Sequence, residues 1–109
     1  MTVSNAPINT ITDKSGVVAA GGVSQTLVAA NSKRRRLIIQ NPSTAALQGI
    51  AGAESLWISY VGAAAVGGGN CIEIQSGTSW DDGVDCPTGQ AVTITATTIN
   101  HKFVCYEGQ

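Results

Sequence analysis

Short apolar segments separated by turn-forming residues are the strongest constraint on how this chain can fold. The alternation of apolar and polar residues is clearest in QAVTITA at 90–96, and RRRLIIQ at 34–40 and SLWISYV at 55–61 are strongly apolar. Runs of this length that are rich in Val, Ile and Thr are typical of β-strands. Further candidate strands are SQTLVAA (24–30), NCIEIQS (70–76) and KFVCYE (102–107), with a weaker one in GVVAAGG (16–22).

Turn-forming residues recur between these segments, with Asn-Pro at 41–42, three glycines at 67–69 and Asp-Gly at 82–83. Many short strands with glycine-rich turns predict an all-β domain. We expect a single β-sandwich, jelly-roll-like, or a small barrel, with about six to eight short strands. A chain of 109 residues suffices for one domain. We expect an extended N-terminal arm over residues 1–15 and the sandwich over residues 16–109.

The alternation also predicts which side chains face the core. Val92 and Ile94 point to one side of their strand, and Leu56 and Ile58 point to one side of theirs, with Trp57 on the opposite side. Several strands carry apolar side chains on both faces, which is expected of a domain covered on both sides, for example by sister subunits. The segment TAALQGIAGAES at 44–55 is expected to be a long loop with room for a short helix.

Charge and hydropathy exclude several classes of partner. Only 12% of the residues are charged and the formal net charge is −1, so no global basic field attracts nucleic acid. The longest apolar stretch, at 60–66, is far shorter than the ~20 residues of a membrane span. The N-terminus MTVSNAPINTITDK lacks the basic and apolar regions of a signal peptide. We therefore expect synthesis in the cytoplasm without Sec export, and neither a membrane nor a nucleic-acid partner.

Residues suited to catalysis or to metal binding are sparse. His101 is the only histidine, no Gly-x-Ser-x-Gly motif exists, and we expect His101 to be exposed in a loop. Asp81, Asp82 and Asp85 lack the alternating order of a calcium loop, so a solvated turn is the better interpretation. We expect no enzyme activity, no cofactor, no metal and no small-molecule substrate.

The three cysteines are Cys71, Cys86 and Cys105, and no two of them form a Cys-x-x-Cys motif. An odd count leaves at least one thiol free or paired to another chain. Two interpretations stay open: reduced, half-buried thiols, or a disulfide within or between subunits that forms in an oxidising medium.

Four consecutive cations, KRRR at 33–36, are most of the six in the chain. In a strand, Arg34 and Arg36 share a side with Ile38 while Arg35 faces the other side, so the arginines do not form one basic surface. A nucleic-acid site needs its cations together. We therefore expect these arginines to reach carboxylates of a neighbouring protein chain, a role for which the guanidinium group is suited.

Five motifs carry a resemblance to a known group of proteins: RRLIIQNPS at 35–43, ESLWIS at 54–59, CIEIQSGTSW at 71–80, VTITA at 92–96 and FVCYE at 103–107. In this order they resemble small virion proteins of tailed bacteriophages, particularly head-decoration and related accessory proteins. In that group, similar motifs mark successive strands of a β-sandwich.

The resemblance covers residues 34–107, about two thirds of the chain. The sequence departs from the group where residues 44–53 stand as an insertion, and where Ser76-Gly77 replaces the usual Pro-Gly. The resemblance implies a capsid decoration, or cement, protein of the virion that forms a homo-oligomer, most simply a trimer, on the major capsid protein. The residues expected at subunit or capsid contacts are Val3, Ile8, Ile11, Arg34, Arg35, Arg36, Trp57 and Trp80.

Two alternatives are open. A tail, baseplate or fibre component that contacts the host surface would use the same kind of sandwich. A carbohydrate-binding β-sandwich module would need exposed aromatic side chains on one face, for which Trp57, Trp80 and Tyr106 are candidates.

Overall fold

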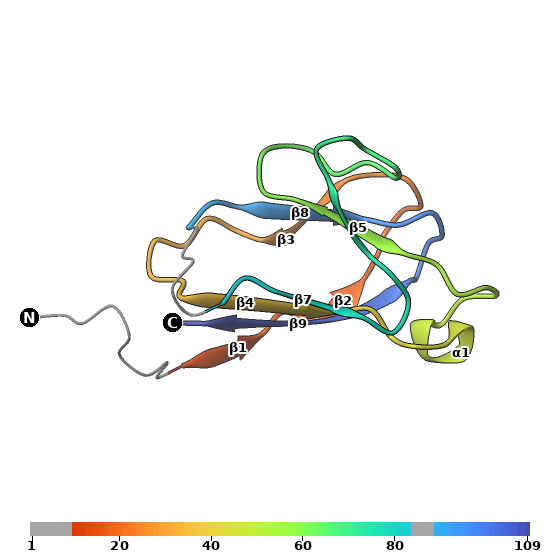
Figure 1. The fold of residues 1–109 in the computed structure, drawn as a ribbon, viewed down its shortest axis with the longest axis horizontal. Helices are drawn as coiled ribbons and strands as arrows, with labels where there is room; N and C mark the ends of the chain where they lie inside the picture. Colours follow the sequence, from red (N-terminus) through yellow and green to blue (C-terminus); the bar gives the residue numbers. More distant parts are fainter. Residues whose placement is uncertain (1–9, 84–88) are drawn as a thin grey trace, which may run out of the picture.

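The computed structural model describes residues 10–83 and 89–109, which fold into two antiparallel β-sheets packed face to face (Figure 1). One short helix lies at one end of the sandwich. The elements are β1 (Ile11–Asp13), β2 (Gly16–Val17), β3 (Gln25–Val28), β4 (Arg36–Gln40), α1 (Ala45–Gln48), β5 (Leu56–Ser59), β6 (Ile72–Ile74), β7 (Ser79–Asp81), β8 (Val92–Thr95) and β9 (Lys102–Gly108).

The first sheet has the order β1-β9-β4-β7, with β2 also paired to β9, and the second has the order β3-β8-β5-β6. β1 and β2 act as one interrupted strand, because Asp13 faces Tyr106 and Gly16 faces Phe103 without a change of register. In the interruption, the hydroxyl of Ser15 accepts a hydrogen bond from the Cys105 N–H.

The pairing of the strands is that of a jelly roll. When β1 and β2 count as one strand, the first strand pairs with the last, the second with the second last, and so on to the central hairpin of β5 and β6. This is the arrangement of a long hairpin folded onto itself into two sheets. The structure confirms the predicted all-β fold, and two separate sheets make it a sandwich.

The core lies between the two sheets and is filled by alternate side chains of their strands. Leu37, Ile39 and Phe103 come from the first sheet, and Ile58 and Ile94 from the second, all of them buried. These inward-facing positions are the ones that the alternation predicts, because side chains two residues apart share a face of the sheet.

Two strands, β7 and β1, differ from what the sequence predicts. β7 forms at Ser79–Asp81, directly before the expected turn at Asp82-Gly83, because it pairs with the well-defined strand β4. The last part of the expected arm, Ile11–Asp13, belongs to the first sheet as β1. Residues 1–9, which contain Val3 and Ile8, lie outside the described residues.

The loop at 44–55 contains a single helical turn, α1, with a defined start and end. The Thr44 hydroxyl accepts a hydrogen bond from the Leu47 N–H, which is a common N-cap interaction. Gly49 has φ of 81°, a left-handed conformation that glycine adopts readily at a helix C-terminus. The helix presents Leu47 to solvent and turns Gln48 into the protein.

Candidate interaction face

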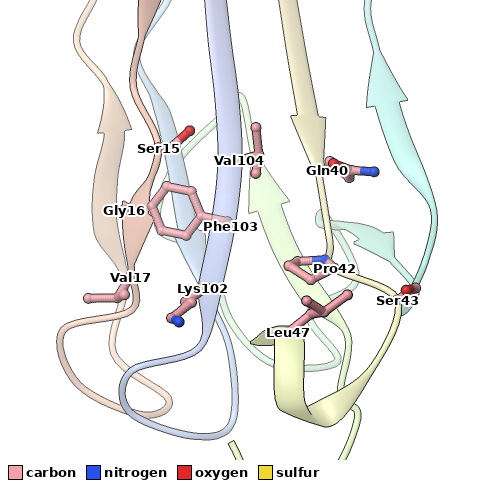
Figure 2. Close-up of a pocket in the computed structure, with 10 residues that line it drawn as sticks. All are labelled: Ser15, Gly16, Val17, Gln40, Pro42, Ser43, Leu47, Lys102, Phe103 and Val104. Carbon is pink, nitrogen blue, oxygen red and sulfur yellow. The ribbon is translucent and has the colours of Figure 1, made fainter. Parts of the chain in front are cut away.

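The outward surface of the first sheet carries several exposed apolar side chains, which no described part of the chain covers. Its strands place alternate side chains outward in register, so that Tyr106 of β9 faces Ile38 of β4. Leu47 of α1 adds to this surface at one end (Figure 2). We call this surface the β9 face, and it comprises Ile11 (68% exposed), Leu47 (59%), Tyr106 (46%) and Val17 (41%), with the half-buried Ile38 and Val104.

A large hollow of about 610 Å³ occupies one end of the β9 face. Figure 2 shows β9 along its floor, with β2 on one side and the end of β4 together with α1 on the other. The aromatic ring of Phe103 lies against Gly16, where a side chain would come within 3.4 Å of the ring. The hollow is lined by Ser15, Gly16, Val17, Gln40, Pro42, Ser43, Leu47, Lys102, Phe103 and Val104.

A second hollow of about 180 Å³ continues along the same strand. It is lined by Ile11, Arg36, Ile38, Tyr106 and Gly108. The large hollow uses the first part of β9 and the small hollow uses the last part, so the two follow one another along the outward side of one strand.

By register, four charged side chains lie on the outward side of the first sheet: Asp13, which faces Tyr106, Lys102, which faces Val17, and the pair of Arg36 and Asp81. Arg36 and Asp81 neutralise each other in an ion pair, with Nη2 2.5 Å from Oδ2. The hydrogen bond from Arg36 holds the pKa of the Asp81 carboxyl below its usual value. Lys102 is the only charged residue that lines the large hollow among the described residues. An occupant of this face would therefore contact apolar side chains together with the exposed charges of Asp13 and Lys102.

Arg34 is not a contact residue, in contrast to the prediction. Its side chain is buried within its own chain, where Nε donates to Glu107 Oε2 at 2.8 Å. The guanidinium group also donates to the carbonyl oxygens of Ala29 at 2.8 Å and Gln90 at 2.7 Å. Alternation does not place Arg34 with Arg36, because β4 begins only at Arg36.

The two other arginines keep some exposure. Arg36 lies on the β9 face and its carboxylate partner belongs to the same chain. Arg35 is half-buried directly before β4, and its backbone N–H donates to the Gly108 carbonyl at 2.8 Å. The structure thus separates the three arginines into three different surroundings.

Trp80 is half-buried with its ring on the inward side of β7, and its contact role stays a prediction. It packs against the core between the sheets, and its Nε1 donates to the Tyr60 hydroxyl at 2.9 Å. The Tyr60 hydroxyl donates in turn to Asp82 Oδ2 at 3.3 Å. Burial raises the pKa of Tyr60 to about 12.

Trp57 lies half-buried on the outward surface of the second sheet, where it faces Glu73 and Thr95. This surface is polar in contrast to the β9 face. The registers place on this side Thr26, Trp57, Glu73 and Thr93, together with the buried Ser59 and Thr95. Trp57 therefore lies on the outer surface of the second sheet, and Tyr106 lies on the outer surface of the first. Trp80 packs between the sheets, so the three residues form no common aromatic platform.

His101 is fully buried, so the prediction of an exposed loop histidine is wrong. Its Nε2 lies 2.9 Å from Asn41 Oδ1. The Asn41 Nδ2 group donates to the carbonyl oxygens of Glu54 and Ile74, both at 2.8 Å, which orients the amide oxygen towards the imidazole. His101 therefore donates from Nε2, and its Nδ1 is left as an acceptor.

Gln48 of α1 joins the same buried network. Its Nε2 donates to Asn41 Oδ1 at 2.8 Å, and its Oε1 accepts from the Glu54 N–H at 3.0 Å. Two buried acceptors in this network have no hydrogen-bond partner among residues 10–83 and 89–109, His101 Nδ1 and Glu54 Oε2. Burial lowers the pKa of His101, and the charge of Glu54 opposes that shift. The network holds α1 and the turn after β4 in place beside the large hollow.

Cys71 and Cys105 are free thiols, so no disulfide joins these two residues. Cys71 is half-buried and Cys105 is buried in the core. Burial raises the pKa of the Cys105 thiol to about 12, which disfavours the reactive thiolate. Cys86 lies outside the described residues.

Within residues 10–83 and 89–109, no group of three or more His, Cys, Asp or Glu side chains could hold a metal ion. In the same part of the chain, no helix is long and apolar enough to cross a membrane.

No protein-family model, no curated protein and no solved structure matches this chain. The β9 face is therefore interpreted from its own residues. Sequence reasoning identified Ile11 and Arg36 on this face but missed Leu47, Val17 and Val104. The sequence pattern could have indicated Val104 and Tyr106, because the last strand is apolar on both sides. Leu47 reaches this face only through the position of α1.

Proposed function

We propose that this protein is a structural component of a tailed-phage particle, a decoration protein that self-associates and binds the outer lattice of the capsid. The observation that carries the proposal is the exposed apolar β9 face with its two hollows. Ile11, Leu47 and Tyr106 gather on one surface, and an exposed group of apolar side chains is typical of an interaction site.

Two further features support this proposal. The strand motifs at 35–43 and 103–107, which resemble those of phage virion proteins, form β4 and β9, the two central strands below the β9 face. The jelly-roll pairing is an architecture that viral capsid proteins share with lectins and cupins, and it supports the proposal by fold-level analogy alone.

The proposed mechanism is the burial of surface at several contacts at once. A protein that binds both its own copies and the capsid lattice buries only a modest surface area at each contact. Because the contacts are linked, the second and third form within one complex, and the whole assembly holds far more tightly than any single contact. Such an assembly would clamp neighbouring capsomers against the pressure of packaged DNA.

The proposal is tested by the copy number of this chain in purified particles of the phage that encodes it. Quantitative mass spectrometry would give its ratio to the major capsid protein. A ratio that matches the capsid lattice is expected. Absence from the particle would overturn the proposal. A few copies per particle would place the protein in the tail, baseplate or fibre instead of on the head.

A carbohydrate-binding module is the alternative from another class, and the positions of the aromatic residues count against it. Sugar platforms use aromatic rings on a shared surface, but Trp57, Trp80 and Tyr106 lie on three separate ones. Titration of the tryptophan fluorescence with a glycan panel is expected to give no shift. A saturable shift from Trp57 would favour the carbohydrate module.

A further inference from the structure

We infer that the β9 face is covered by residues 1–9 of a second copy of this chain, so that the copies exchange their N-terminal segments. This inference rests on the self-association proposed above and names the surface and the segment that produce it. Four observations lead to it: the course of the hollows, the chemistry of the segment, the way the backbone of β9 is used, and the point where the chain leaves the sheet.

The two hollows together have the length of an extended peptide. They follow the outward side of β9 from Lys102 to Gly108. At the rise of a β-strand this distance is about 20 Å. Residues 1–9 span up to about 30 Å when extended, so they are long enough to follow both hollows.

The chemistry of the segment matches that of the face. The sequence MTVSNAPIN contains no Asp, Glu, Lys or Arg and carries apolar side chains that include Val3 and Ile8. The large hollow has Lys102 as its one charged lining residue within the described part of the chain. An uncharged, partly apolar peptide is therefore a suitable occupant of the large hollow.

The backbone of β9 cannot accept a further strand, because β9 already pairs with β1 and β2 on one side and with β4 on the other. An occupant must bind through side chains laid over the face. A segment with Pro7, which lacks a backbone N–H, is suited to this kind of docking and unsuited to strand addition.

The direction of the chain favours a second copy as the source of the segment. Thr10 and Gln109 exchange two backbone hydrogen bonds, of 3.0 and 2.9 Å, so the ladder of β1 and β9 continues to the last residue. Residues 1–9 therefore begin beyond the end of β9, whereas the large hollow lies at its other end, by Lys102. Docking on the same molecule would require the chain to reverse directly before Thr10, and an onward course leads to a neighbour.

Exchange of this kind joins two different surfaces, a segment and a face. In such an arrangement, each copy binds the next one through the same two surfaces. The copies form a closed ring when the rotation between neighbours allows it. It is compatible with the trimer that the resemblance implies, and every copy then has its β9 face covered.

The first test measures self-association of the purified full-length chain by sedimentation and light scattering. Val3→Asp/Ile8→Asp changes the segment and Leu47→Glu changes the rim of the large hollow. Val61→Glu is the matched control, because Val61 is 72% exposed and does not line either hollow. We expect both test variants to raise the dissociation constant by about tenfold or more and the control to leave it unchanged. Circular dichroism checks that all variants are folded.

The second test identifies the molecule that supplies the segment. A photo-crosslinking phenylalanine analogue at position 8 is placed in isotopically heavy chain, which is mixed with light chain and irradiated. We expect heavy segments joined to light peptides that contain Val17, Leu47 or Val104. Crosslinks that join heavy segments only to heavy peptides, even at high dilution, would show that the segment docks on its own molecule. This result would overturn the inference.

The remaining outcomes also overturn it, and they leave the proposed function to its own test. Association that survives Val3→Asp/Ile8→Asp but is lost in Leu47→Glu would show two β9 faces packed directly on each other. A chain that stays monomeric would show that the face awaits a different protein. In both cases the copy number in particles still decides the virion function, and a chain absent from particles can still exchange segments.

Discussion

Arg34 and Glu107 show what a single buried charge pair requires of its surroundings. Arg34 Nε donates to Glu107 Oε2, and the rest of the guanidinium group donates to the carbonyl oxygens of Ala29 and Gln90. A buried guanidinium ion is tolerated only when its donors are satisfied and its charge is compensated. The pair thereby ties the segment before β4 to the end of β9 and to the loops beside them.

Loss of one partner of this pair is expected to leave an uncompensated buried charge. Arg34→Ala should lower the free energy of unfolding by about 3–5 kcal/mol in urea denaturation. Arg36→Ala is the matched control, because its ion pair with Asp81 is half-exposed, and it should cost far less. Equal losses in the two variants would contradict the assignment of Arg34 to the interior.

His101 is the second residue whose environment sets its behaviour. It is buried in the neutral form with Nε2 bonded to Asn41 and with Nδ1 unpaired among the described residues. Burial keeps its pKa below the value of 6.5 for a free histidine. The folded protein therefore binds a proton at His101 less readily than the unfolded chain does.

This difference predicts a loss of stability in mild acid. Because the pKa in the folded state is lowered, the stabilisation is fully present above pH 6.5 and is lost as the pH falls through the folded pKa. The slope is at most about 1.4 kcal/mol per pH unit for one proton. Urea denaturation between pH 8 and pH 5 measures it, and a chain with a single histidine makes the assignment clear.

His101→Gln is the control for the pH series. Glutamine keeps a donor for Asn41 Oδ1 but does not titrate, so the stability of this variant should be nearly flat between pH 8 and pH 6. A variant with the same pH dependence as the original chain would assign the effect to a different group.

At the scale of elements, the loop between β2 and β3 shows how closely two connections pack. A side chain at Gly21 would place its Cβ 2.4 Å from the Thr97 carbonyl oxygen in the loop between β8 and β9. The neighbouring Gly22 N–H donates to the Ala96 carbonyl at 2.7 Å. The two loops therefore meet through their backbones, and only glycine permits this approach at position 21.

Gly21→Ala is expected to destabilise the fold by about 1–3 kcal/mol, because the backbone must shift to admit the methyl group. Gly52→Ala is the matched control in another loop, since a Cβ there meets nothing within 4 Å. Thermal unfolding of both variants measures the difference. A Gly21→Ala variant as stable as the control would show that the loops separate at little cost.

At the scale of the whole molecule, the jelly roll pairs segments that lie far apart in the sequence. The first strand pairs with the last, and only β5 with β6 pairs within a short distance along the sequence. Pairing of distant segments costs chain entropy before the contacts stabilise the fold. Topologies of this kind fold slowly in comparison with helical domains of the same size.

We therefore expect refolding in milliseconds to seconds, as in other sandwiches dominated by distant pairings. Stopped-flow fluorescence measures it, with Trp80 between the sheets as the reporter. Trp57→Phe removes the second tryptophan, which lies on the outer surface and reports less on sheet packing. Refolding in microseconds would show that local contacts dominate the folding of this chain.

Residue alternation sufficed to predict the strands around Ile39, Ile58, Val92 and Phe103, because a period of two places these side chains in one core regardless of partners. The end of β4 at Asn-Pro was equally local, since proline cannot continue a ladder. β7 could not be predicted in this way. Three residues carry too little pattern, and Ser79–Asp81 becomes a strand only because β4 lies beside it.

What the sequence determined by itself was therefore the all-β class, the core-facing side chains of the main strands and the scarcity of charge. The tertiary structure alone decided which polar residues are interior and which apolar residues are exposed. Arg34 and His101 are buried because Glu107 and Asn41 reach them from distant strands. Leu47 joins Val17 and Val104 on one face because the jelly roll brings α1, β2 and β9 together. Burial and exposure depend on neighbours that are far apart in the chain, and no local pattern of residues contains that information.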